Sequence, residues 1–236
     1  MVNSHKFAGL TVNYEAKCEL LKRRSEKFIT EYTDKPDISI DIPFGFFEKK
    51  QRENPNLTID ECEYLWLGGE FYKQLIDFDG FLLHSSTVVM DGEAYMFSAA
   101  PGTGKSTHAA LWLKLFGKRA HVLNDDKPCL RLTDGEFFAC GTPFSGKSDL
   151  SENETVRAKA ICFLERGEEN SIRRLESKEV ILRFLNQTHR PASPELMEKL
   201  LSLLNELCKK VPFYLLHCNM DISAAKLSHE VMSAGN

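Results

Sequence analysis

The chain has 236 residues, and its 34 acidic and 30 basic side chains give a formal net charge of −4. Hydrophobic residues make up 42% of the sequence, a globular composition that excludes disorder as the main state. The slightly acidic balance argues against a protein that binds nucleic acid through a general basic surface, so we expect no nucleic-acid partner.

The first 79 residues predict a small α+β segment. Apolar side chains recur at helical spacing between Glu15 and Glu31, and Ile38–Ile42 alternates apolar and polar residues as a half-buried strand does. Thr58 and Glu61 have the spacing of a capping box, which predicts a helix that begins there and runs to Leu75.

Residues 80–236 predict strands joined by tight turns, with helices between and after them. Asp91-Gly92 predicts a hairpin between strands Phe81–Met90 and Ala94–Ala99, and Asp134-Gly135 predicts a second hairpin. The other predicted strands are Ala120–Leu123, Cys129–Leu132, Phe137–Cys140, Ala160–Leu164, Ile172–Leu175 and Phe213–Cys218. The predicted helices are Lys105–Phe116, Lys178–Thr188, Pro194–Lys210 and a short one capped by Asp221. Because a purely parallel doubly wound sheet contains no hairpins, the predicted class is α/β with a mixed sheet.

Cysteine usage and hydropathy predict the compartment. The chain has seven cysteines, none of them in a CxxC pair, a pattern that favours free thiols in a reducing cytosol. The charged N-terminus lacks the apolar region of a signal peptide, and no run approaches the ~18 apolar residues of a membrane span. We therefore expect a cytoplasmic protein without a membrane partner.

The segment Ala99–Thr107 has the sequence of a phosphate-binding loop, or P-loop. The glycines let the backbone N–H groups converge on phosphate oxygens, a lysine reaches the β- and γ-phosphates, and a hydroxyl ligates Mg²⁺. The loop follows a predicted strand and opens a predicted helix, whose N-terminus also favours anions. The residues predicted to bind nucleotide are Ala100, Pro101, Gly102, Thr103, Gly104, Lys105, Ser106 and Thr107. The alternative interpretation is a glycine-rich turn without a ligand.

Two adjacent carboxylates, Asp125 and Asp126, end the predicted strand that follows the P-loop helix. An acid at this place can bind the metal ion or act as a base. Neighbouring side chains of a strand point to opposite faces, so both reach the phosphates only if the chain turns there. Asn-Asp-Asp is also ordinary turn composition, and a solvated turn is the alternative.

The P-loop sequence and the acid pair, in this order along the chain, resemble the motifs of the HPr kinase/phosphorylase family and of its relative phosphoenolpyruvate carboxykinase. His84 precedes Lys105 by 21 positions, as a histidine precedes the P-loop in that family, although a lone strand histidine is more often structural. The resemblance covers about residues 80–145. The segment Gly141–Lys147 also looks like that of stand-alone HPr-kinase-like proteins, some of which accompany peptide-modifying enzymes and phosphorylate serine side chains.

The resemblance implies a role for each matching residue. Lys105 and Ser106 would hold ATP and Mg²⁺, with Asp125 as a second metal ligand. Either Asp125 or Asp126 would be the general base, and the order in the family favours Asp126. His84 would support the phosphate or the base.

The sequence departs from the family pattern at two points. The acidic metal ligand that the family places near Phe138 is missing, and the later catalytic arginine cannot be aligned. Candidates for that arginine are Arg166, Arg173 and Arg174. Lys147 can reach the γ-phosphate from a second loop, or it can be an ordinary solvated lysine.

These residues predict an ATP-dependent kinase that transfers the γ-phosphate to a hydroxyl, with a serine of a peptide or protein as the expected acceptor. A modified-peptide precursor is one such acceptor. The alternatives are an ATP-binding switch or sensor with little or no transfer activity, and a small-molecule kinase acting, for example, on free serine. The expected architecture is a mixed-sheet P-loop kinase core, residues 80–236, preceded by the segment 1–79. The family often forms oligomers, which leaves a homo-oligomer open.

Overall fold

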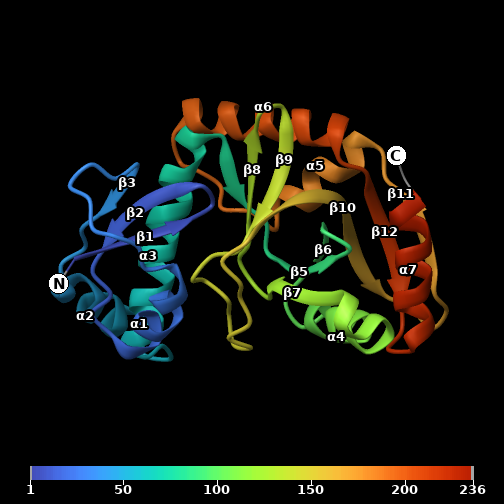
Figure 1. Cartoon of the computed structure of the whole chain (residues 1–236), viewed down its shortest axis with the longest axis horizontal. Helices are drawn as coiled ribbons and strands as arrows, with labels where there is room; N and C mark the ends of the chain where they lie inside the picture. Colours follow the sequence, from blue (N-terminus) through green and yellow to red (C-terminus); the bar gives the residue numbers. More distant parts are fainter. Residues whose placement is uncertain (1, 235–236) are drawn as a thin grey trace.

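The computed structural model describes residues 2–234, which form a three-stranded sheet and a nine-stranded sheet with helices packed on both (Figure 1). The strands are β1 (Asn3–Phe7), β2 (Leu10–Tyr14), β3 (Ile38–Ile40), β4 (Gly80–Leu82), β5 (Ser85–Met90), β6 (Glu93–Ser98), β7 (Ala120–Asn124), β8 (Cys129–Thr133), β9 (Glu136–Cys140), β10 (Thr155–Arg166), β11 (Ser171–Arg174) and β12 (Phe213–Cys218). The α-helices are α1 (Glu19–Ser25), α2 (Phe44–Glu53), α3 (Ile59–Leu75), α4 (Lys105–Phe116), α5 (Ser177–Leu185), α6 (Pro194–Lys210) and α7 (Ile222–Ala234). Short 3₁₀ turns follow α1 (Glu26–Phe28), α3 (Ile76–Phe78) and α4 (Gly117–Arg119).

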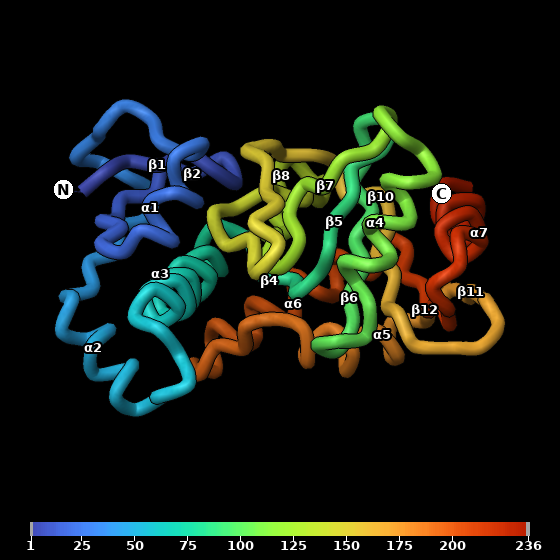
Figure 2. Tube along the Cα trace, turned by 90° about the horizontal axis from the view of Figure 1, so that it is seen from below, coloured from blue at the N-terminus to red at the C-terminus, as the bar shows by residue number. Residues whose placement is uncertain are grey.

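Residues 2–79, here called the N-terminal unit, consist of the sheet β1-β2-β3 and helices α1 to α3. The unit lies at one end of the molecule, and α7 lies at the other (Figure 2). The predicted capping box is confirmed: the Thr58 hydroxyl accepts from the Glu61 N–H at 3.1 Å, and the Glu61 carboxylate accepts from the Thr58 N–H at 2.8 Å.

The large sheet is mixed, as the sequence predicted, with the order β4-β8-β9-β10-β6-β5-β7 and with β12 and β11 branching from β10. β10 alternates its side chains between the two faces. Ile161 and Phe163 pack under α5 and α6, whereas Cys162 and Leu164 pack under α4 and α7. Helix α6 crosses the top of the sheet in Figure 1, and α4 and α7 cover the other face.

Among the predicted elements, three differ most from the observed ones, and α5 and β3 end two or three residues earlier than predicted. The predicted strand Phe81–Met90 is two strands, because β4 pairs with β8 while β5 pairs with β6 and β7. The predicted helix Glu15–Glu31 is α-helical only over Glu19–Ser25, followed by the 3₁₀ turn. The predicted strand Ala160–Leu164 is the middle of β10, which has 12 residues because three neighbouring strands pair with it.

The N-terminal unit shares a hydrophobic core with the β8–β9 hairpin. Cys129, Cys140 and Phe144, all fully buried, pack in the same cluster as Phe71 and Leu75 of the N-terminal unit. The cluster buries apolar surface from both parts of the chain, which stabilises their contact. None of the helices within residues 2–234 combines the length and apolar character that a membrane span requires.

Candidate active site

The topology of the large sheet brings the sequence motifs to one edge. β5 is antiparallel to both β6 and β7, so β6 and β7 run in the same direction and end at the same edge, where β5 begins. The register pairs Ser85 with Ser98 and Thr87 with Asn124. The P-loop after β6, the aspartates after β7 and His84 before β5 therefore lie at this edge, which is where ligands bind in open α/β sheets.

The P-loop turns sharply between β6 and α4. Gly102 and Gly104 have φ values of 76° and 125°, in the region that favours glycine. Lys105 begins α4, is buried, and donates from Nζ to the Ala99 carbonyl at 3.1 Å. Burial lowers the pKa of its ammonium, and the carboxylates of Asp126 and Asp125 partly offset that effect. Both carboxylates thus lie within electrostatic reach of the P-loop lysine.

The chain turns directly after β7. The Asn124 side-chain oxygen accepts hydrogen bonds from the N–H groups of Asp126 (3.0 Å) and Lys127 (2.8 Å), which bends the backbone into an Asx turn. Because the backbone turns here, the alternation of side chains along a strand no longer forces the two carboxylates onto opposite faces of the sheet. Asp125 then accepts a hydrogen bond from the Ser86 hydroxyl on β5.

Asp126 is held by three donors. Its Oδ1 lies 3.2 Å from His84 Nε2, and its Oδ2 accepts from the Tyr64 hydroxyl at 3.2 Å and from the Lys127 ammonium. Burial raises the pKa of the carboxyl and is the largest single effect, but the hydrogen bond from His84 and the charge of Lys127 together outweigh it. The pKa of Asp126 therefore lies well below its usual range. Asp126 is an anion at every physiological pH.

His84 occupies the break between β4 and β5 and faces oxygens with both ring nitrogens. Its Nδ1 lies 3.0 Å from Gln187 Oε1, and its Nε2 lies 3.2 Å from Asp126 Oδ1. Both ring nitrogens are thus held by side-chain partners, which fixes the orientation of the imidazole. The backbone is fixed as well, because the His84 N–H donates to the Gln187 carbonyl at 2.7 Å and Ser98 Oγ donates to the His84 carbonyl at 2.8 Å.

Arg166 is the arginine candidate that the structure brings to the P-loop. It ends β10, and its Nη2 donates to the Gly102 carbonyl at 2.6 Å. Arg173 pairs with Glu179 at 2.7 Å, and Arg174 lies on the outer strand β11, whose register places it opposite Tyr214. Neither contact involves the P-loop.

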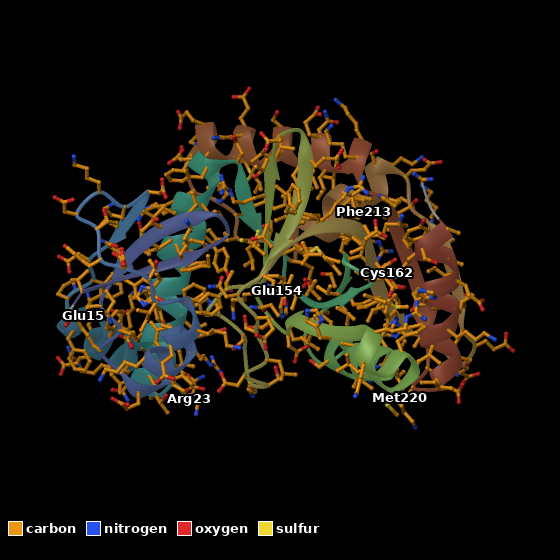
Figure 3. All side chains as sticks on the ribbon, viewed as in Figure 1. Glu15, Arg23, Glu154, Cys162, Phe213 and Met220 are labelled. Carbon is orange, nitrogen blue, oxygen red and sulfur yellow. The ribbon has the colours of Figure 1, made fainter. Side chains whose placement is uncertain are left out.

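Two cavities flank the P-loop, and Arg166 lines both. One, of about 330 Å³, is lined by P-loop residues together with Arg183 and Gln187, the residue that holds His84. The other, of about 420 Å³, lies along α4 at the ends of β10 and β12 and has an apolar wall of Leu111, Leu164 and Met220. Figure 3 labels Phe213 at the start of β12 and Met220 just beyond its end.

Lys147, predicted as a second phosphate-binding lysine, is exposed in the loop between β9 and β10. Its charge acts on the Glu61 carboxylate of α3, whose pKa is lowered first by hydrogen bonds from Thr58 and then by Lys147. This electrostatic interaction is with the N-terminal unit. The role of Lys147 at a phosphate stays a prediction.

The residues that sequence reasoning missed come from distant parts of the chain. Tyr64 lies on α3 and Gln187 follows α5, and no local pattern marks either as a neighbour of Asp126 or His84. Gly146 is another: a Cβ there would lie 2.6 Å from Asp126 Cβ, and its φ is +68°. Lys127 is the partner that the sequence could have indicated, because it directly follows Asp125 and Asp126.

The donor set at this edge fits Mg²⁺. Ser106 in the first turn of α4 and the Asp125 carboxylate are oxygen donors, and Mg²⁺ usually combines one or two such ligands with phosphate and water. Among residues 2–234, no group of three or more His, Cys, Asp or Glu side chains forms a metal cage.

The comparisons with known proteins found likeness in structure but none in sequence. No family model matches the chain, and no curated protein matches its sequence. Among solved structures, the chain is similar to the HPr(Ser) kinase/phosphatase from Coxiella burnetii, with 12% sequence identity and a TM-score of 0.37. The match covers 65% of this chain and 99% of the other. Because the likeness is this weak, it assigns no role to any site residue, and each role is inferred from the geometry of this chain.

Proposed function

We propose that the chain is an ATP-dependent phosphotransferase that transfers the γ-phosphate to a hydroxyl, and that the acceptor is a serine of a peptide or protein. The observation that carries the proposal is the single sheet edge that unites the P-loop sequence, the acid pair and His84. Phosphoryl transfer requires neutralised phosphate oxygens, an aligned acceptor and a base, and this edge offers residues for each task.

The phosphates would be bound by the loop amides and Lys105, with Arg166 at the outer side of the loop. Positive groups placed in advance stabilise charge that develops on the transferred phosphoryl group. Bound Mg²⁺ would neutralise phosphate oxygens, with Ser106 and Asp125 as its protein ligands. The apolar cavity along α4 is placed to receive the nucleoside, since it adjoins Thr107 and the P-loop backbone.

Asp126 would accept the proton of the acceptor hydroxyl. Its lowered pKa keeps it unprotonated but makes it a weak base, so its contribution would lie mainly in orienting the hydroxyl and in taking the proton late in the transfer. The cavity that contains Arg183 and Gln187 lies on the His84 side of the P-loop, so an acceptor side chain would enter there. The serine peptide as acceptor is supported by the likeness of the segment Gly141–Lys147 to stand-alone HPr-kinase-like proteins, some of which accompany peptide-modifying enzymes and phosphorylate serine side chains.

An ATP-binding switch with little or no transfer is the second candidate. It is favoured by the position near Phe138, where the family has an acidic metal ligand and this chain has none. Weaker metal binding would slow transfer more than it weakens nucleotide binding, because the metal neutralises charge mainly in the transition state.

Incubation with γ-labelled ATP, Mg²⁺ and a panel of serine peptides, with free serine as a separate arm, tests the proposal. We expect label in a peptide, and a loss of about 10²–10⁴-fold in the rate for Asp126→Asn with ATP binding retained. Asp134→Asn, at an exposed hairpin turn, is the matched control. Label on free serine alone would favour the small-molecule kinase, and ATP binding without label in any acceptor would favour the switch. Undiminished transfer by Asp126→Asn would remove Asp126 as the base.

A further inference from the structure

The N-terminal unit reaches the proposed base through one side chain, Tyr64. The Tyr64 hydroxyl lies 3.2 Å from Asp126 Oδ2, 3.2 Å from Lys127 Nζ and 3.0 Å from the Gly146 N–H. An ammonium and a backbone N–H are obligate donors, so the hydroxyl accepts from both. Its single proton is then directed to Asp126. All hydrogen-bonding positions of this hydroxyl are used, and they join α3, the acid pair and the β9–β10 loop.

The ring of Tyr64 is fixed as tightly as its hydroxyl. Tyr64 is only 6% exposed, and it contacts the Phe144 ring edge-on at a centroid distance of 5.7 Å. The guanidinium of Arg24 lies 4.9 Å from the ring centroid, and the Lys127 ammonium lies 4.7 Å from it. Cation–π contacts of this length are attractive, and partial burial strengthens them. The side chain therefore has one available orientation.

Arg24 also ties the β9–β10 loop to the N-terminal unit. Its Nε lies 2.6 Å from Asp149 Oδ1, and its Nη2 donates to the Gly146 carbonyl. Arg23 adds a second ion pair to Asp149, at 2.5 Å. In Figure 1 the loop lies beside α1, and Figure 3 labels Arg23 at that edge. The loop packs so close to Asp126 that only glycine fits at position 146.

We propose that the N-terminal unit completes the phosphotransfer site, with Tyr64 as the positioning residue that orients Asp126 and holds the β9–β10 loop against it. The inference rests on the proposed function for the reaction that it serves. Two of the three donors to Asp126, His84 and Lys127, come from residues 80–236, and the third comes from α3. Without Tyr64, Oδ2 keeps only the flexible ammonium of Lys127, and the Gly146 N–H loses its acceptor.

Tyr64→Phe in the full chain is the test, because it keeps the ring and removes only the hydroxyl. We expect kcat for phosphate transfer to fall about tenfold or more, since small displacements of a reacting group are costly, while KM for ATP changes by less than about twofold. The control is Tyr14→Phe, which removes another buried hydroxyl of the N-terminal unit, one that is hydrogen-bonded to Ser25 at 2.7 Å and is not a donor to Asp126. We expect Tyr14→Phe to lower Tm without lowering kcat.

A second measurement does not depend on activity. Lys147 is exposed in the β9–β10 loop, so the rate of tryptic cleavage after Lys147, measured by mass spectrometry, reports how firmly the loop is held. Tyr64→Phe should raise this rate severalfold, and Tyr14→Phe should leave it unchanged. A wild type that transfers phosphate while Tyr64→Phe keeps its kcat would overturn the inference. If the wild type transfers none, the proposed function fails, and an unchanged cleavage rate in Tyr64→Phe would then overturn the positioning role as well.

Discussion

At the scale of single residues, the site consists of charges that hold one another in place. Asp126 is kept ionised by a histidine and a lysine and also accepts a hydrogen bond from a tyrosine, while Lys105 is buried within reach of both aspartates. The sequence predicted the residue types and their order, because the P-loop and the acid pair are local patterns. The resemblance implied His84 as a support for the base, but nothing in the sequence indicated Tyr64, which is 62 positions from Asp126 and reaches the site only through the fold.

The hydroxyl of Ser86 gives a prediction about the metal ion. Ser86 donates to Asp125, and a hydrogen bond to a ligating carboxylate fixes its orientation. Ser86→Ala should therefore raise the Mg²⁺ concentration needed for half-maximal transfer about tenfold. Ser85→Ala is the control, since Ser85 is equally buried but bonds to Leu83 and Thr87. An Mg²⁺ titration in which both variants match the wild type would exclude Asp125 as a metal ligand held by Ser86.

At the scale of elements, helix α3 connects the N-terminal unit to the site. The capping box at its start could be predicted from Thr58 and Glu61, because a capping box involves only two residues that are three positions apart in the sequence. The division of the predicted strand Phe81–Met90 into β4 and β5 could not be predicted from the sequence. It depends on the segment after α5, where Thr188 Oγ1 donates to the Leu82 carbonyl and Gln187 accepts from the His84 N–H. Contacts across about 100 residues leave no local signal.

Two adjacent glycines of α3 predict opposite effects on stability. A Cβ at Gly68 would lie 2.9 Å from the buried Phe144 ring, whereas a Cβ at Gly69 has no neighbour within 4 Å. Gly69→Ala should stabilise the protein by about 0.5–1 kcal/mol through helix propensity. Gly68→Ala gains the same propensity but overpacks the interface, and should destabilise by about 1–2 kcal/mol. Urea unfolding of the two variants checks this, and equal stabilities would contradict the packing of α3 on Phe144.

At the scale of the whole molecule, the N-terminal unit and the large-sheet part of the chain are joined by a shared hydrophobic cluster. The sequence separated residues 1–79 from residues 80–236 by a change of pattern. Strands β1–β3 form one sheet and β4–β12 the other, and the cluster that joins Phe71 to Cys140 and Phe144 connects residues far apart in the sequence. Buried apolar residues carry no mark of which partner they will meet, so the contact between the two parts could not be predicted.

Buried histidines on both parts predict how stability depends on pH. Burial lowers the pKa of His5 in β1 and of His108 in α4 from 6.5 to about 4. Between these values the unfolded chain binds protons that the folded chain does not, so stability is complete above pH 6.5 and falls as the pH decreases toward 4. Each histidine should cost up to about 3 kcal/mol over this range. Urea unfolding at pH 7 and pH 4.5 should show the loss in the wild type and a smaller loss in His5→Phe or His108→Phe. A flat profile would contradict the burial of these rings as neutral groups.

The central claim is that the segment Ala99–Thr107 binds the phosphates of a nucleotide at the edge where Asp125 and Asp126 lie. Calorimetric titration of the full chain with ATP and Mg²⁺ tests this claim most directly. We expect one ATP per chain, with binding weakened at least about tenfold in Lys105→Ala and unchanged in Lys118→Ala, which alters an exposed lysine beyond α4. No binding of ATP by the wild type at millimolar concentration, or equal binding by Lys105→Ala, would contradict it.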